Sequence, residues 1–204
     1  NTYTYVLLDS HNNPNQATNK PYSYKNNRIN LLANYRLHAM SSLRGGVKYN
    51  KMKRDYTDVE REETEETTFF AKWKIKPHSI VDFSLLGETS ERDGSEYITP
   101  TGENPAMRKY HLADRTKDKV AGTIDIMATD KLFMSAKAEY SQIEYDTSTI
   151  GLIDSSQPVY YVDFTYQPTQ NISTYVYYTN ETPESYKTGT DLSTSATTPL
   201  DADF

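Results

Sequence analysis

Apolar and polar residues alternate along four stretches of the chain, and each stretch is interrupted once by a short break. Between residues 69 and 76, for example, Phe69, Ala71, Trp73 and Ile75 take every second position, and the alternate positions are Phe70 and three lysines. Successive side chains of a strand point to opposite faces, so this period of two predicts strands with one apolar and one polar face. The four stretches, residues 28–50, 68–88, 122–141 and 162–181, are therefore each predicted to form a hairpin.

Longer polar segments separate the predicted hairpins. They are expected to be loops, at about residues 51–67, 89–117, 146–157 and 182–204. Short breaks at one end of the hairpins and long connections at the other are typical of an antiparallel up-and-down sheet whose two rims differ. We expect about nine strands, counting Thr2 to Leu8, in one β-barrel section without a separate soluble domain.

The alternating runs are about nine to eleven residues long, which is the length that a tilted strand needs to cross a bilayer. Aromatic residues stand near the ends of the runs, as in the girdles of membrane barrels. We expect Tyr35, Trp73 and Tyr166 to face lipid at the short-turn rim. The predicted fold class is all-β, an antiparallel up-and-down transmembrane β-barrel. A soluble β-sandwich would also alternate and stays open as an alternative.

Composition narrows the possible classes of protein. The chain of 204 residues has no cysteine, which excludes disulfides, thiolate metal sites and haem attachment through a CxxCH motif. No run approaches the roughly 18 consecutive apolar residues of a transmembrane helix, so a helical membrane protein is excluded. The net charge is −6, and the basic residues are not clustered into the surface that binding to phosphates requires. No nucleic-acid partner is therefore expected.

Catalytic motifs are absent from the sequence. No G-x-S-x-G, Walker or HExxH element occurs, so we predict no catalytic, cofactor-binding or metal-binding residue and no enzymatic activity. The four histidines, His11, His38, His78 and His111, are scattered and lack the spacing of metal ligands. The acidic run from Asp55 to Glu66 is interpreted as a solvated loop.

One loop carries a family resemblance. The run RKYHLADRTKDK at residues 108–119 follows ERDGSEY at 91–97 and GENP at 102–105. Together with the hairpins from about Tyr24 to Glu181, it resembles the MtrB/PioB family of decahaem-associated outer-membrane β-barrel proteins. The residues of this family-motif loop are Arg108, Lys109, Tyr110, Leu112, Ala113, Asp114 and Arg115.

The resemblance implies a section of a large barrel in the outer membrane of a Gram-negative bacterium. Such a barrel sheathes a periplasmic decahaem cytochrome, meets an extracellular multihaem cytochrome at its outer rim and serves extracellular electron transfer. Haem would then be carried by the partners and not by this chain. Short turns usually lie on the periplasmic side, so the motif loop is expected at the cell exterior. We also expect the loop between residues 89 and 117 to be ordered.

Charged residues on the polar face are the expected contacts with an enclosed partner. Seven basic and four acidic residues form this set, a balance that favours haem propionates or acidic patches. The set comprises Arg28, Arg36, Arg44, Lys48, Lys72, Lys74, Asp82, Asp125, Lys137, Glu139 and Asp163. Two alternatives remain open: a porin-like or small outer-membrane barrel without a cytochrome, and a soluble β-sandwich binding module.

Overall fold

The computed structural model describes residues 4–6, 16–18, 22–56, 59–99, 104–190 and 199–203, and all regular structure in these ranges is β-strand. The strands are β1 Thr4–Val6, β2 Gln16–Thr18, β3 Ser23–His38, β4 Ser41–Asp55, β5 Glu63–His78, β6 Val81–Gly94, β7 Arg115–Thr129, β8 Leu132–Glu144, β9 Gly151–Thr169, β10 Ile172–Glu181, β11 Glu184–Thr190 and β12 Pro199–Asp203.

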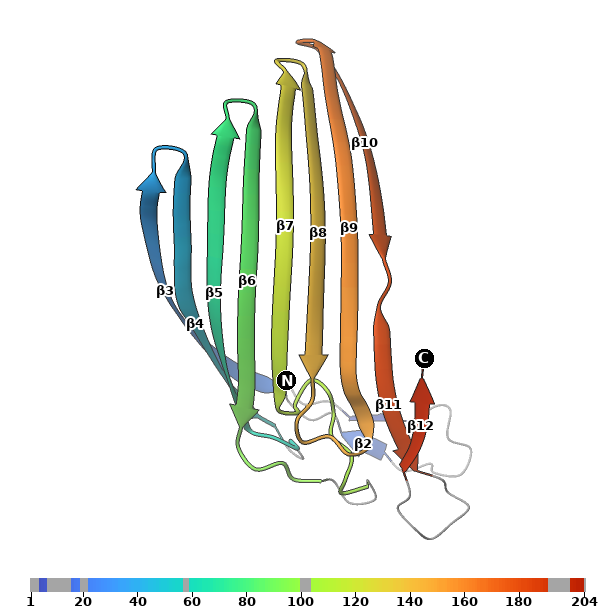
Figure 1. The fold of residues 1–204 in the computed structure, drawn as a ribbon. Coiled ribbons are helices and arrows are strands. Elements are labelled where there is room, and N and C mark those ends of the chain that lie inside the picture. The colour runs from blue at the N-terminus through green and yellow to red at the C-terminus, as the bar shows by residue number, and fades with distance from the viewer. Residues whose placement is uncertain are drawn as a thin grey trace.

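Neighbours along the chain are neighbours in the main sheet. Strands β3 to β9 pair antiparallel in order, as Figure 1 shows. β10 and β11 both pair with β9, one on each half of its length, and Pro183 stands between them without an N–H to continue the ladder. β12 then pairs with β11. The predicted antiparallel up-and-down sheet is therefore confirmed, although the sheet of the described residues is not closed.

Two expectations about the strands differ from the structure. Of the predicted strand Thr2 to Leu8, the structure describes Thr4–Val6, which pairs with Gln16–Thr18 in a separate two-stranded sheet and not in the main sheet. The other residues of that prediction lie outside the described ranges. The main strands also extend beyond the alternating runs, since backbone pairing continues where both faces are polar. The connections shrink from the predicted 51–67, 89–117 and 146–157 to residues 56–62, 95–114 and 145–150, and the predicted loop 182–204 contains β11 and β12.

The two ends of the sheet differ as the sequence predicts. Four two-residue turns join the strands at one end, and the long connections gather at the other (Figure 1). The turns are Ala39-Met40, Ser79-Ile80, Asp130-Lys131 and Gln170-Asn171. Pro77 lies within β5, where the register between β5 and β6 shifts, so the second turn falls two residues later than the proline indicates.

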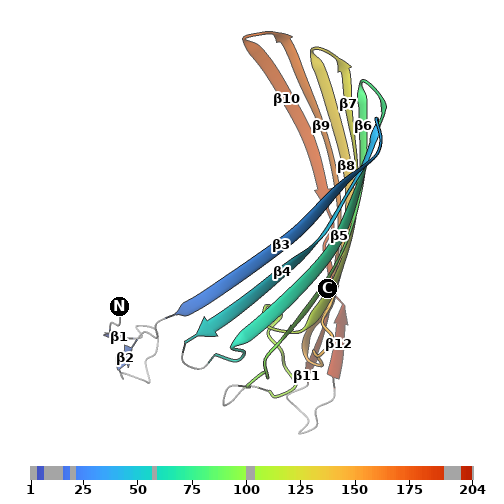
Figure 2. The ribbon, with the colours of Figure 1, turned by 90° about the vertical axis from the view of Figure 1, so that its left-hand side faces the viewer.

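The sheet is curved, so its two faces are unequal (Figure 2). Every buried strand residue that the structure describes lies on one face, which we call the inner face. The register places on it the even-numbered residues of β3–β6 and the odd-numbered residues of β7–β10. The opposite face is the outer face. Buried examples on the inner face are Thr68, Ser90, Ala121 and Asp163.

Candidate functional site

The outer face carries an apolar belt on the half of each strand nearest the two-residue turns. No charged side chain occupies an outer-face position of this belt, and many of its large side chains are exposed: Leu31 is 68% and Phe69 55% exposed. Exposed apolar surfaces of this extent mark contact with a membrane or a partner. The belt comprises the outer-face positions of residues 29–35 (β3), 43–49 (β4), 69–75 (β5), 81–87 (β6), 120–126 (β7), 132–140 (β8) and 158–166 (β9).

Beyond the belt, the outer face becomes polar and charged on the same strands. We call this part of the sheet the polar extension; on β6, for example, Gly87 is followed on the outer face by Thr89, Glu91 and Asp93. The belt edge follows the sheet register, because its last residues on β6 to β9 are cross-strand partners. Seven to nine residues at about 3.3 Å each give about 23–30 Å along the strand, slightly fewer residues than the roughly nine to eleven of a tilted strand that crosses a bilayer.

The inner face stays mostly polar behind the belt. The structure places all eleven charged residues of the predicted lumen set on this face, because the register preserves the alternation that the sequence shows. Their contact with a partner stays a prediction. By strand, they are Arg28 and Arg36 (β3), Arg44 and Lys48 (β4), Lys72 and Lys74 (β5), Asp82 (β6), Asp125 (β7), Lys137 and Glu139 (β8) and Asp163 (β9).

Some inner-face charges are paired with one another, either within a strand or between strands. Lys48 Nζ lies 2.9 Å from Glu88 Oε2. The Glu139 carboxylate receives both Lys119 and Lys137, each at 2.6 Å. These pairs fix side chains along the wall and neutralise its charge locally.

Four cations near the two-residue turns have no such partner among the described residues. Arg36, Arg44, Lys72 and Lys74 form no ion pair with any residue that the structure describes. They lie on β3, β4 and β5 near the two-residue turns, behind the belt. This part of the inner face therefore carries uncompensated positive charge.

The three predicted interface aromatics lie on the outer face near the two-residue turns. Tyr35 and Trp73 flank Leu43 in one register row, and Tyr166 stands opposite Leu132 at the end of β9. The Trp73 indole N–H donates to Ser41 Oγ at 2.8 Å. Their contact with lipid remains a prediction.

The family-motif loop packs against the inner face at the far end of the polar extension. Its residues Leu112 and Ala113 are both 0% exposed, so they form the centre of a small core. Met107 also forms a bridge with Ile150 of the neighbouring connection. The part of the loop from 104 onward is thus compactly folded against the sheet, whereas residues 100–103 lie outside the described ranges.

Two buried arginines hold this loop, and sequence reasoning missed both. Arg61 donates to the carbonyls of Ser95 and Leu112, each at 2.7 Å, and pairs with Asp114 at 2.7 Å. Arg61 belongs to the acidic run that was interpreted as a solvated loop. That interpretation was wrong for Arg61, which is 5% exposed. The available signal in the sequence was that Arg61 is the one basic residue in this acidic run.

The second buried arginine, Arg92, extends from β6. Its guanidinium donates to the carbonyl oxygens of Tyr110 and Ala113 at 2.6–2.9 Å. Burial lowers the pKa of Arg92 to about 10, so the side chain still carries its charge at neutral pH. The motif loop is therefore fastened to the sheet chiefly through its backbone carbonyls.

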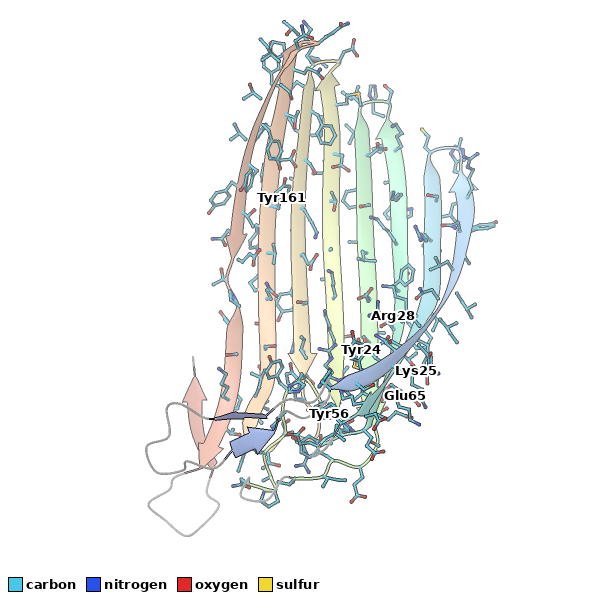
Figure 3. The ribbon with its side chains drawn as sticks, turned by 180° about the vertical axis from the view of Figure 1, so that it is seen from behind. Tyr24, Lys25, Arg28, Tyr56, Glu65 and Tyr161 are labelled. Carbon is cyan, nitrogen blue, oxygen red and sulfur yellow. The ribbon has the colours of Figure 1, made fainter. Side chains whose placement is uncertain are left out.

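Acidic residues of the polar extension are also paired. Burial opposes ionisation of Glu66, but the charge of Arg115 and the hydroxyl of Ser90 outweigh it, so the pKa of Glu66 lies below its ordinary value. Hydrogen bonding from Lys51 lowers the pKa of Glu65 in the same way. Figure 3 labels Glu65, Lys25, Tyr24 and Tyr56 at the long-connection end of the sheet, and Tyr161 nearer the other end.

Neither a metal cluster nor a spanning helix is found in the part of the chain that the structure describes. No group of three or more His, Cys, Asp or Glu residues there is placed to hold a metal ion. Likewise, no helix in those residues is long and apolar enough to cross a membrane.

Comparison with known proteins agrees with the belt and the open sheet. The family model described as outer membrane beta-barrel porin, MtrB/PioB, matches residues 1–203. The chain belongs to the MtrB/PioB family. The match extends beyond residues 24–181, which carried the resemblance in the sequence. This membership places the protein in the outer membrane and confirms the predicted fold class.

A curated relative supports the same family. The chain is 30% identical over 177 residues to "Outer membrane protein MtrB" from Shewanella baltica (strain OS185). The aligned part covers 85% of this chain but 25% of the relative. The chain therefore spans about a quarter of the length of the MtrB protein that it matches, and an open sheet is what a quarter of a barrel wall would form.

Proposed function

We propose that this chain forms part of the wall of an outer-membrane barrel that encloses a periplasmic decahaem cytochrome for extracellular electron transfer. The wall keeps the haems in line and separates them from lipid. Haem is carried by the partners, and the chain's own role is architectural and not catalytic. The long-connection end, including the family-motif loop, faces the cell exterior, where it meets a second multihaem cytochrome.

The observation that best supports this proposal is the charged inner face directly behind the apolar belt. A barrel packed only by its own side chains would need these charges to be paired, because unpaired buried charges are costly. Arg36, Arg44, Lys72 and Lys74 have no acidic partner among the described residues. A polar occupant with acidic groups would compensate them.

A porin-like barrel with a water-filled lumen is the second candidate, because water also tolerates charges on the inner face. The two candidates differ in whether a protein lies against the inner face. Purification of the intact barrel in mild detergent provides a first distinction. A complex with haem absorbance is expected, whereas a colourless barrel would favour the porin. A protein soluble without detergent would point to the β-sandwich instead.

Two adjacent phenylalanines provide a matched test of the enclosed partner. Phe69 points to the outer face and Phe70 to the inner face of the same strand. In the intact protein, we would make Phe70→p-benzoylphenylalanine and, as control, Phe69→p-benzoylphenylalanine and irradiate cells. Position 70 is expected to cross-link to a haem-carrying polypeptide, and position 69 is not. A folded barrel in which neither position captures such a polypeptide would overturn the proposal.

A further inference from the structure

A shallow groove of about 380 Å³ lies on the inner face over β3 to β6. Its lining is unusual for this face, because apolar side chains and cations stand side by side. The apolar part is formed by Leu32, Phe70 and Leu86, and the cations Arg44, Lys48 and Lys72 surround it. Such a mixed lining suits a group with an apolar body and a negative charge.

The apolar part of the groove, which we call its floor, depends on a glycine. Leu32, Gly46 and Phe70 are cross-strand partners in one register row. A Cβ atom on Gly46 would lie 3.0 Å from Leu32 Cδ2 and 3.2 Å from the Phe70 ring, closer than ordinary contact. The two apolar side chains therefore approach each other over β4 because no side chain separates them.

Two of the cations beside the floor have no acidic partner among the described residues to balance their charge. Arg44 and Lys72 are direct cross-strand partners, and like charges in this position destabilise a sheet. Neither forms an ion pair with a described residue. Lys48, by contrast, pairs with Glu88 and lies 4.8 Å above the Phe70 ring. The groove thus retains two adjacent positive charges, and a single anionic group between them would pair with both and reduce their repulsion.

We propose that this groove is the contact site for a carboxylate-bearing, partly apolar segment of the enclosed protein. The carboxylate lies between Arg44 and Lys72, where the guanidinium offers two parallel hydrogen bonds, and the apolar part packs on Leu32, Phe70 and Leu86. The inference rests on the proposed function, because the occupant is the protein that the barrel encloses.

Charge reversal in the intact barrel, expressed with its partners, tests the groove. Arg44→Glu combined with Lys72→Glu places two acids where the carboxylate binds. We expect the haem retained per folded barrel, after purification in mild detergent, to fall about tenfold or more. Arg44→Gln with Lys72→Gln removes the repulsion between the cations without adding charge. This variant should fold at least as well as the wild type, and it should also lose haem.

A matched control comes from the same sheet. Lys25 and Lys53 are likewise direct cross-strand partners, but they lie on the outer face in the polar extension. Lys25→Glu with Lys53→Glu should leave haem retention unchanged. If the glutamine variant folds and retains as much haem as the wild type, the groove inference is overturned while the proposed function stands. If the wild-type barrel itself retains no haem protein, the proposed function is overturned.

Discussion

The apolar belt and the polar extension consist of the same strands, yet their side chains have different surroundings. In the belt, outer-face residues such as Phe69 and Leu85 are exposed and apolar. In the extension, the outer-face residues of those strands are Glu65 and Glu91. The inner face is mostly polar in both halves. The change from an apolar to an aqueous environment along a strand is therefore visible in the residues of the outer face only.

The halves also differ in what stabilises them. The extension contains the buried centre around Leu112, held by Arg61 and Arg92, whereas the belt has a few buried inner-face residues but no such core. Backbone hydrogen bonds hold the belt, because every N–H and C=O within a bilayer has to be satisfied in the sheet. Perturbations of polar contacts should thus loosen the extension, and perturbations of outer-face apolarity should destabilise the belt.

The largest expected effect is in the extension. Arg61→Ala leaves Asp114 and two carbonyls without their cationic partner at a buried site, which should cost about 3–5 kcal/mol of local stability. Hydrogen exchange over residues 104–114 should rise sharply while that of the belt stays slow. Arg28→Ala, which removes one exposed hydrogen bond to Asn50, is the control and should change little. Unchanged exchange in the Arg61 variant would mean that the loop does not depend on this arginine.

The second prediction compares two outer-face positions of β6. Leu85→Arg introduces a charge in the middle of the belt and should lower the free energy of unfolding in a bilayer by about 2–4 kcal/mol. Glu91→Arg, in the extension, should change it by about 0–1 kcal/mol. Denaturant titration of the intact reconstituted barrel measures both. Equal effects would contradict the boundary of the belt.

Acid should loosen the extension before the belt. Because the pKa of Glu66 in the folded protein lies below its ordinary value of 4.5, ionisation of Glu66 contributes stability above that pH. This contribution is lost as the pH falls through the lowered pKa, when the ion pair with Arg115 breaks. Hydrogen exchange at decreasing pH, corrected for the intrinsic rate, should show early opening around Glu66. Glu66→Gln should show weaker protection at neutral pH and less change in acid.

The smallest effect concerns Trp73, the single tryptophan of the chain. At the turn-side end of the belt, its indole should lie at the level of the lipid headgroups. In reconstituted barrels, lipids brominated near the headgroup should quench its fluorescence more than lipids brominated at the chain ends. Absence of quenching by both lipids would place Trp73 away from lipid and reverse the assignment of the two faces.

Much of this architecture could be predicted from residue alternation. The period of two is a local property, so it was sufficient to predict hairpins, the short turns and the shared face of Arg44, Lys72 and Asp163. It also placed Tyr35 and Trp73 on the opposite face. The motif run at 108–119 predicted the family, because a distinctive local sequence needs no tertiary structure to be read.

Other features depended on the tertiary structure. The ends of the strands in the extension could not be predicted from the sequence. Where both faces of a strand are polar, apolar and polar residues do not alternate, so no period of two is visible. Arg61 appeared to be one more loop charge, since its carbonyl partners lie 34 and 51 positions along the chain. The groove exists only because the sheet register brings Leu32, Gly46 and Phe70 into one row. Pairing between distant segments is set by the whole sheet, and no local pattern in the chain specifies it.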